Sequence, residues 1–176
     1  KSNIIKHYHL AENKLRIIVP SRLEPIQKQP MLLLDACCLL QQEEKEKIQI
    51  IYTGLDKQYE KFVEGLLDKA KKNNIDIKII RFDDMAEVYK IADLTVLPSK
   101  SESFGYSALE SLSLGIFTIL NDIPTFNEIV KGNENNYVFK NSEVELKEKI
   151  EELIKNQEAL IRKMPKKEWQ KQYDLD

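Results

Sequence analysis

The sequence predicts an α/β fold built on a doubly wound parallel sheet of about six strands, with helices on both faces. Short apolar runs alternate with longer amphipathic stretches along the chain, which is typical of strands joined by helical crossovers. The runs are apolar nearly throughout, as expected for parallel strands that are buried on both faces. Right-handed crossovers between such strands give a sheet that is wound in two directions from its middle.

The first half of the chain supplies three predicted strands and two predicted helices. Residues 16–20 (RIIVP) form an apolar strand that stops at a proline. Residues 31–42 (MLLLDACCLLQQ) are long enough and rich enough in helix formers for a helix. Residues 48–54 (IQIIYTG) form a second strand ended by a glycine, and residues 57–73 a helix whose apolar side chains share one face. Residues 75–82 (IDIKIIRF) are the third strand.

The second half repeats this pattern. A short helix over residues 83–92 leads into the strand 93–98, which closes at a proline. The helix over residues 106–114 ends at Gly115, a residue type favoured just after helices. The remaining predicted elements are the strand 116–120, a short helix over 125–130, the short strand 136–139 and a final helix over 144–161.

The composition favours a single globular domain and excludes several classes of protein. The chain has 176 residues, of which 42% are hydrophobic and 32% charged, so it can bury a sizeable core. No apolar run approaches the roughly 20 residues that cross a bilayer. Its 27 basic and 29 acidic residues are mixed along the chain, which gives no support for a nucleic-acid partner. Cys37 and Cys38 are adjacent in an apolar helix and are predicted to be reduced, buried thiols.

Two loops are expected to face each other across a ligand. The commonest order of such a sheet is 3-2-1-4-5-6, and ligands bind beyond the carboxyl ends of the strands where the winding reverses, between the first and fourth strands. Residues 20–28 (PSRLEPIQK) follow the first strand, and residues 98–106 (PSKSESFGY) follow the fourth. The sequence therefore predicts the ligand site between these two segments.

The first of these loops carries Arg22 and Lys28. Arginine presents a planar fork of donors that matches a phosphate, and lysine adds a compact charge, so the pair suits a diphosphate. A pair of solvated surface cations is the alternative, and the spacing alone leaves it open. The glycine patterns of dinucleotide oxidoreductases and of P-loop NTPases are absent from the sequence, which argues against both classes.

The second loop leads into the helix that begins at residue 106. If Ser103 caps this helix, the backbone N–H groups of Phe104, Gly105 and Tyr106 stay free at its positive end. Such an end attracts an anion or a ring of hydroxyls. Glycine at position 105 would let a ligand approach the backbone closely.

Glu102 and Glu110 stand at the loop tip and on the helix, with seven residues between them. A carboxylate only accepts hydrogen bonds, which suits the vicinal hydroxyls of a ribose or hexose. The two acids are therefore placed to hold the two sugars on either side of a diphosphate. The alternative is one helix-capping glutamate and one solvated glutamate.

Two blocks of the sequence resemble a known family. VPSRLEPIQKQPMLLLDA and YKIADLTVLPSKSESFGYSALESLSLGIFTILNDIPTFNEIV are similar to the C-terminal, nucleotide-sugar-binding half of retaining glycosyltransferases of the GT-B fold, the large group 1 family. The resemblance covers residues 15–161 and implies a Rossmann-like domain, one half of a GT-B fold. The long second block is highly specific because its glutamate spacing, Phe-Gly pair and final Glu-Ile-Val segment occur in order.

The resemblance implies roles for individual residues. Arg22 and Lys28 would bind the donor diphosphate and neutralise the leaving nucleotide, and Glu102 would contact the donor hexose near its anomeric carbon; these three are the predicted catalytic residues. The neighbouring amides would hold sugar and phosphate, the second glutamate would hold the ribose, and the base would lie just past the third strand. The implied binding residues are Phe104, Gly105, Tyr106, Glu110, Arg81 and Phe82.

The resemblance also implies an activity: transfer of a sugar from a nucleoside-diphosphate sugar to an acceptor, with retention, in glycan or surface-polysaccharide synthesis. No cofactor and no metal are expected, because positioned cations stabilise the leaving group. Residues 1–14 would connect to a missing N-terminal half, 15–161 would bind the donor and 162–176 would be a tail. That missing half would bind the acceptor glycan, lipid or protein and make any peripheral membrane contact. The fragment would be cytoplasmic and inactive alone.

Two other functions stay open on the same fold: a non-catalytic binding domain, and half of a nucleotide-sugar epimerase or phosphorylase. The chain departs from the family pattern at Ser21 and Gln29, where glycines are usual, and at residues 123–125 (IPT), where many members have Gly-Gly. The first departure predicts a loop that sits slightly farther from the phosphates.

Overall fold

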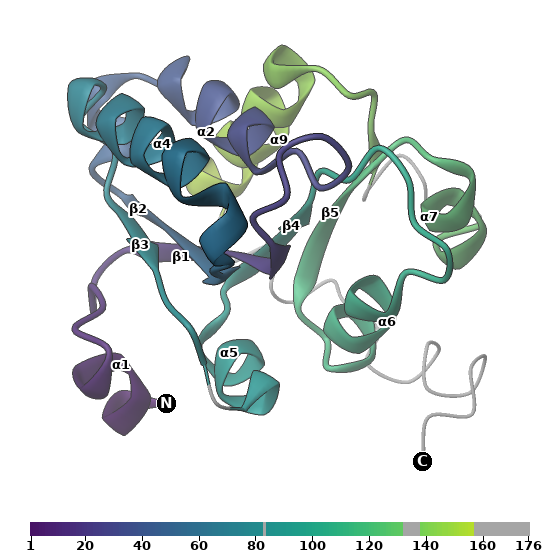
Figure 1. The fold of residues 1–176 in the computed structure, drawn as a ribbon, viewed down its shortest axis with the longest axis horizontal. Helices are drawn as coiled ribbons and strands as arrows, with labels where there is room; N and C mark the ends of the chain where they lie inside the picture. The colour runs from purple at the N-terminus through teal and green to yellow at the C-terminus, as the bar shows by residue number, and fades with distance from the viewer. Residues whose placement is uncertain (83, 132–137, 157–176) are drawn as a thin grey trace.

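The computed structural model describes residues 1–82, 84–131 and 138–156, which form one six-stranded sheet flanked by helices (Figure 1). The strand order is β3-β2-β1-β4-β5-β6, and every neighbouring pair is parallel. The winding reverses between β1 and β4, which are hydrogen-bonded neighbours in the middle of the sheet. The predicted fold class and strand order are confirmed.

The strands are β1 (Leu15–Arg22), β2 (Ile48–Gly54), β3 (Ile77–Ile79), β4 (Leu94–Leu97), β5 (Phe117–Asn121) and β6 (Val138–Phe139). The helices of the described residues are α1 (Ser2–His7), α2 (Pro30–Cys38), α3 (Gln42–Lys45), the 3-10 turn η1 (Lys57–Tyr59), α4 (Glu60–Lys72), α5 (Met85–Ile91), α6 (Tyr106–Ser113), α7 (Pro124–Ile129) and α9 (Glu143–Lys155). None of these helices has both the length and the apolar character needed to cross a membrane.

Different helices cover the two faces of the sheet because successive side chains of β1 point to opposite sides. Ile17 and Val19 belong to the larger core, which lies beneath α2, α4 and α9 (Figure 1). Ile18 points to the other face and packs in a cluster with Val88 and Ile91 of α5. Both faces of β1 are therefore buried, which explains why its sequence is apolar rather than alternating.

The ends of β1 and β2 approach each other unusually closely. β1 runs farther than predicted, so that Arg22 is its last residue and not a loop residue. Arg22 pairs with Gly54, and the Leu23 N–H donates to the Gly54 carbonyl oxygen at 2.8 Å. A Cβ on Gly54 would lie 2.5 Å from both the Arg22 Cα and the Ser21 carbonyl oxygen, so only glycine fits. This contact fixes where Arg22 leaves the sheet.

Several predicted boundaries are wrong, and local hydrogen bonds explain them. The predicted helix 31–42 ends early as α2, because Gln41 forms a capping box with Glu44 and starts the separate helix α3. The predicted helix 57–73 begins with η1, which is capped by the Asp56 carboxylate. The predicted strand 75–82 is only β3, an edge strand whose ladder follows β2 for three residues. Parts of the last predicted strand and helix, and the predicted tail, lie outside the described residues.

Residues 2–7 form the helix α1, although no helix is predicted for the segment 1–14. Tyr8 at the end of α1 packs its ring against Phe82, with the ring centroids 4.5 Å apart. Its hydroxyl donates to the Glu87 carboxylate of α5 at 3.3 Å. The N-terminal segment is thus packed against the same layer as α5 (Figure 1).

Candidate functional site

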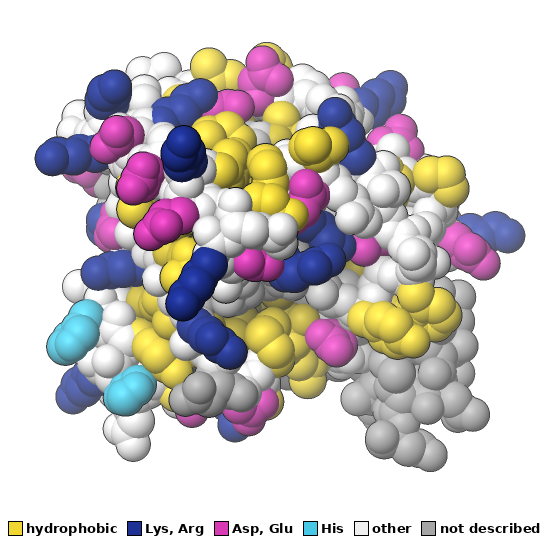
Figure 2. All heavy atoms as spheres, viewed as in Figure 1, with side chains coloured by type: hydrophobic (Ala, Val, Ile, Leu, Met, Phe, Trp, Pro, Cys, Tyr) yellow, Lys and Arg dark blue, Asp and Glu magenta, His cyan; other side chains and the backbone are white. Residues whose placement is uncertain are grey.

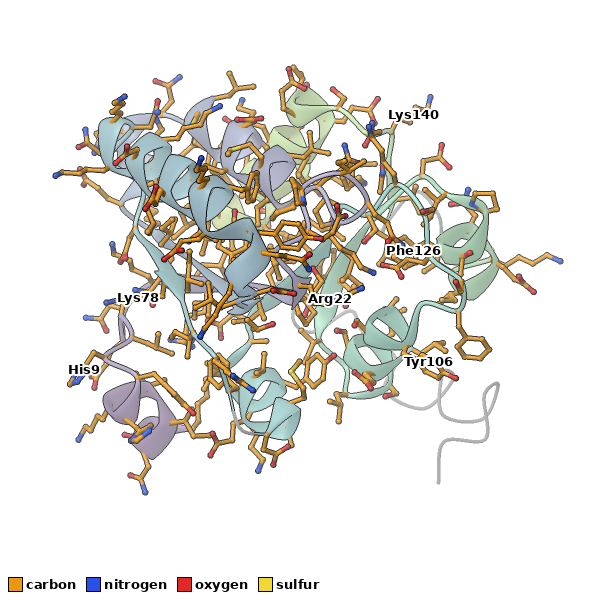
Figure 3. The ribbon with its side chains drawn as sticks, in the orientation of Figure 1. His9, Arg22, Lys78, Tyr106, Phe126 and Lys140 are labelled. Atoms are coloured by element: carbon orange, nitrogen blue, oxygen red, sulfur yellow. The ribbon has the colours of Figure 1, made fainter. Side chains whose placement is uncertain are left out.

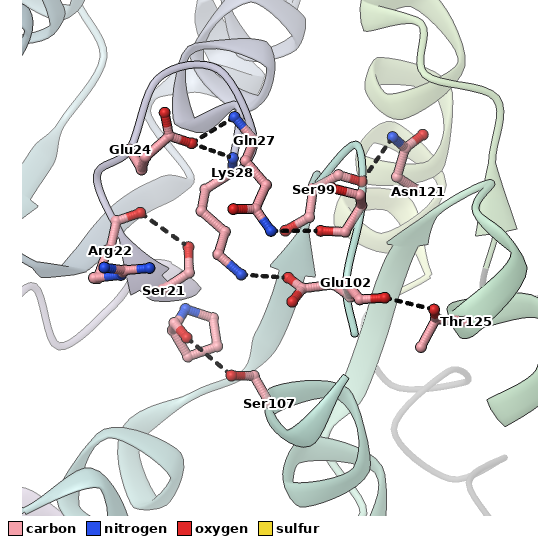
Figure 4. A network of polar contacts seen from close by, with 12 residues as sticks. Ser21, Arg22, Glu24, Gln27, Lys28, Ser99, Glu102, Ser107, Asn121 and Thr125 are labelled. Carbon is pink, nitrogen blue, oxygen red and sulfur yellow. Dashed lines mark hydrogen bonds and ion pairs between the residues drawn. The ribbon is translucent and has the colours of Figure 1, made fainter. Parts of the chain in front are cut away.

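The loops that follow β1 and β4 lie against each other at the carboxyl ends of their strands (Figure 4). Gln27 makes this contact through its backbone and its side chain. The Lys100 N–H donates to the Gln27 carbonyl oxygen at 2.7 Å, and Gln27 Nε2 donates to the Ser101 carbonyl oxygen at 3.0 Å. The structure therefore brings together the two segments between which the sequence predicts the site.

Lys28 and Glu102 form an ion pair across the two loops (Figure 4). The lysine Nζ lies 2.6 Å from the glutamate Oε1, and the two side chains are only 15% and 16% exposed. Water and salt screen such a sheltered pair less than an exposed one. The cation predicted for the phosphate and the acid predicted for the sugar are thus direct partners.

Glu24 organises the backbone of the first loop, a role that the sequence reasoning missed. Its carboxylate accepts hydrogen bonds from the N–H groups of Ile26, Gln27 and Lys28. Burial by itself raises the pKa of Glu24, but the three hydrogen bonds outweigh burial and lower this pKa, so the carboxylate stays charged. An acid just before a proline at the start of a loop was the available signal. The bonds fix the backbone from which Lys28 projects.

The second loop is tied to the elements that follow it. Thr125 Oγ1, in α7, donates to the Glu102 carbonyl oxygen at 2.7 Å. Asn121 Nδ2, at the end of β5, donates to the Ser99 carbonyl oxygen at 3.0 Å. The backbone of Glu102 is therefore held on one side by α7 while its side chain meets Lys28 on the other.

Helix α6 begins with Gly105 as its N-cap, so the prediction that Ser103 caps it is wrong. Gly105 has a φ of 79°, in the left-handed region that favours glycine. A Cβ there would lie 2.9 Å from Ile129 Cδ1 and 3.3 Å from Phe126 Cε1, both in α7. The glycine is thus required by backbone conformation and by packing on α7, which differs from the predicted reason of ligand approach.

The start of α6 opens onto a pocket of about 350 Å³. Lys28 and Glu102 line it, together with Phe104, Gly105 and Tyr106. The rings of Phe104 and Tyr106 are exposed and lie with their centroids 4.5 Å apart. Among the described residues, the backbone N–H groups of Phe104, Gly105 and Tyr106 donate to no backbone oxygen. In the part of the chain that the structure describes, these amides are thus free of backbone partners, and their role in holding a ligand stays a prediction.

Glu110 lies farther along α6 and is held by a residue that the sequence reasoning did not identify. The hydroxyl of Tyr89, in α5, donates to Glu110 Oε2 at 2.6 Å. Burial and then this hydrogen bond raise the pKa of Tyr89. Ser107 Oγ donates to the Pro20 carbonyl oxygen at 3.2 Å, which holds α6 against the end of β1. No spacing rule in the sequence links Tyr89 to Glu110.

Arg22, Arg81 and Phe82 lie at or just past the end of a strand. Arg22 is exposed at the end of β1 (Figure 3). Arg81 is exposed just past β3. Phe82 is partly buried and packs on Tyr8 in the cluster between the sheet and α1 and α5. The structure therefore joins Phe82 to the N-terminal segment, and the prediction that it lies near a base stays a prediction.

A larger pocket, of about 570 Å³, lies beside α9. Its lining includes acids on Asp122, Glu145, Glu148 and Glu152. Lys140 and Lys149 also line this pocket, but the four acids outnumber them and disfavour a diphosphate, whereas the smaller pocket balances Lys28 against Glu102 and adds backbone amides. Over the face shown in Figure 2, basic and acidic side chains are interspersed. Among the described residues, no group of three or more His, Cys, Asp or Glu is arranged to hold a metal ion.

Several solved structures share this fold. The catalytic domain of cholesterol-alpha-glucosyltransferase from Helicobacter pylori is 22% identical, with a TM-score of 0.72 over 90% of this chain and 96% of that one. HepE from Anabaena, solved with UDP and glucose, is 19% identical, with a TM-score of 0.78 over 97% and 48%. A glycosyltransferase from Rickettsia africae is 19% identical, with a TM-score of 0.80 over 93% and 43%. The chain thus spans less than half the length of the last two proteins.

No curated protein matches the chain in sequence. The solved structures are too distant in sequence to show more than the fold. The family model described as glycosyl transferases group 1 matches residues 1–171, nearly the whole chain. The chain therefore belongs to the glycosyl transferases group 1 family, as its resemblance predicts.

Proposed function

We propose that the chain is the donor-binding half of a glycosyltransferase that takes a nucleoside-diphosphate sugar as its donor. The observation that carries the proposal is the pocket at the end of β1 and β4, where Lys28, Glu102 and the free amides at the start of α6 converge. Arg22 stands at the end of the same strand β1. HepE, which shares the fold, was solved in complexes with UDP and with UDP-glucose, and this supports the same donor class.

The pocket suits the charge changes of glycosyl transfer. When the bond between the sugar and the diphosphate breaks, negative charge grows on the leaving phosphate. Lys28, held by Glu102, and Arg22, exposed at the end of β1, supply positive charges, and the N–H groups at the start of α6 supply dipoles. Together they lower the energy of the leaving group without a metal ion.

The two glutamates divide the sugars of the donor between them. Glu102 lies beside Lys28 in the pocket, where its carboxylate accepts hydrogen bonds from the transferred hexose. Glu110 lies farther along α6, where its exposed carboxylate accepts from the ribose. The base then lies toward Arg81, past the end of β3.

The wider assignment rests on the family. We assign retention of the anomeric configuration, a role in glycan or surface-polysaccharide synthesis and action in the cytoplasm on this basis. An N-terminal half, fitting the share of the longer neighbours that this chain leaves uncovered, would bind the acceptor glycan, lipid or protein.

Calorimetric titration of this chain with UDP, ADP and GDP tests the donor site. We expect at least one of them to bind, and Arg22→Ala to weaken that binding about tenfold through loss of a charge-assisted phosphate contact. Lys61→Ala, at an exposed position of α4, is the matched control and should leave binding unchanged. Wild-type binding that Arg22→Ala does not alter rules out the diphosphate role. Failure of all three nucleotides to bind favours a non-catalytic domain.

A further inference from the structure

Tyr89 and Glu110 connect two helices on the same side of the sheet. Tyr89 lies in α5 and Glu110 in α6, and the tyrosine hydroxyl donates to Glu110 Oε2 at 2.6 Å. The tyrosine is only 7% exposed, whereas the glutamate is exposed. A buried, well-packed ring therefore holds one end of a side chain whose other end faces solvent.

The chemistry of the pair fixes which atom carries the proton. Burial, and then the hydrogen bond to the neighbouring carboxylate and its charge, raise the pKa of Tyr89. The phenol keeps its proton at neutral pH and must donate, since a carboxylate can only accept. Glu110 Oε2 is thereby occupied. Among the described residues, no hydrogen bond to Oε1 is found, so this oxygen is left for a ligand.

An exposed glutamate without such a partner samples several rotamers, and a ligand must then restrict them at a cost in conformational entropy. Tyr89 removes much of that freedom before the ligand arrives, which raises affinity by preorganisation. The gain applies only to ligand groups that bind Glu110. A ligand that bypasses Glu110 gains nothing from Tyr89.

We propose that Tyr89 is a positioning residue that presents Glu110 Oε1 to the ribose and so makes the site select ribonucleotides over 2′-deoxyribonucleotides. A ribose offers two vicinal hydroxyl donors, and one carboxylate oxygen has two lone pairs to accept them when its orientation is fixed. A 2′-deoxyribose offers only one donor. The inference rests on the proposed donor site and names a determinant of its nucleotide specificity.

The test compares Tyr89→Phe with the wild type by calorimetry. The probes are whichever of UDP, ADP and GDP binds the wild type best, and its 2′-deoxy counterpart. The wild type should bind the ribonucleotide about tenfold more tightly than the deoxyribonucleotide. Tyr89→Phe keeps the buried ring but loses the hydroxyl, so it should weaken the ribonucleotide about fivefold and the deoxyribonucleotide less. The ratio of the two affinities should therefore fall.

Two controls separate positioning from a structural effect. Tyr52→Phe removes the hydroxyl of another buried tyrosine, which donates to the Pro30 carbonyl oxygen at 3.0 Å, and it should leave the ratio unchanged. In a Glu110→Gln background, Tyr89→Phe should have no further effect on the ratio, because the two residues act as one unit. An effect that persists in that background overturns the inference.

The outcomes also distinguish this inference from the proposed function. If the wild type binds a nucleoside diphosphate and Tyr89→Phe leaves the ribose preference intact, the positioning role is wrong and the donor site stands. Equal weakening of both nucleotides by Tyr89→Phe likewise overturns the positioning role. If no nucleoside diphosphate binds the wild type, the donor site itself fails, and the inference fails with it.

Discussion

Lys28 and Glu102 form an ion pair in the candidate site, although each is assigned to a different part of the proposed donor. A diphosphate that engages Lys28 must compete with the Glu102 carboxylate. A donor that carries a sugar compensates Glu102 with hydroxyl donors, whereas a bare nucleoside diphosphate does not. Under the proposed function, we therefore expect the pair to favour the donor over the nucleotide that remains after transfer.

This competition predicts the sign of a simple substitution. Glu102→Gln removes the negative charge that opposes the diphosphate, so we expect this variant to bind the nucleoside diphosphate about threefold to tenfold more tightly, as measured by calorimetry. Glu110→Gln makes the same change of charge in α6. It should weaken binding instead, because Glu110 is assigned to the ribose and does not pair with Lys28. Tighter binding in both variants would point to a general charge effect and contradict the competition.

At the residue scale, contacts between the loops that follow the central strands could be predicted from the sequence. Lys28 and Glu102 are brought together by the strand order, which the alternation of elements predicts. The bond from Tyr89 to Glu110 depends on how α5 and α6 pack, and no periodicity encodes that. Glu24 escaped notice because its partners are backbone amides, which are the same in every sequence.

At the element scale, the start of α6 depends on backbone conformation more than on a capping side chain. The rule that serine, threonine, aspartate or asparagine caps a helix favours Ser103. A left-handed glycine two residues later overrides it, because Gly105 turns the chain and packs on Phe126 and Ile129 of α7. Packing across α6 and α7 is not visible in the local sequence, so the predicted cap was wrong.

Paired glycine substitutions test this explanation by urea unfolding. Gly105→Ala places a Cβ at a φ of 79° and 2.9 Å from Ile129 Cδ1, and should lower the free energy of unfolding by about 1–3 kcal/mol. Gly65→Ala in α4 has nothing within 4 Å of the new Cβ and should raise it by about 0.5–1 kcal/mol. Gly105→Ala without a loss of stability would contradict the packing account.

At the scale of the whole molecule, the central pairing of β1 with β4 has a charged contact at its other end. Arg16, only 5% exposed, places Nη2 2.7 Å from Asp93 Oδ2. Its Nε donates to the Ile91 carbonyl oxygen at 2.8 Å, and its Nη1 to that of Ala11 at 3.2 Å. One buried guanidinium thus joins the start of β1 to the start of β4, opposite the candidate site.

Removing that guanidinium should destabilise the whole domain. Arg16→Met leaves the Asp93 carboxylate without its buried partner and should lower the free energy of unfolding by about 3 kcal/mol, as measured in urea. Lys14→Met is the matched control, because its ion pair with Asp76 is 29% and 30% exposed. It should cost less than about 1 kcal/mol. Similar losses in the two variants would contradict the special role of the buried contact.

The residues of the candidate site are also far apart along the chain, since Lys28 and Glu102 are separated by 74 positions. During synthesis the first loop is complete long before the second exists, and each loop alone lacks half of the pocket. Contacts between such distant segments form late in folding, because closing the long intervening stretch costs entropy. A nucleotide that binds this site would therefore stabilise only the completed sheet. It would slow unfolding without speeding the early steps of folding.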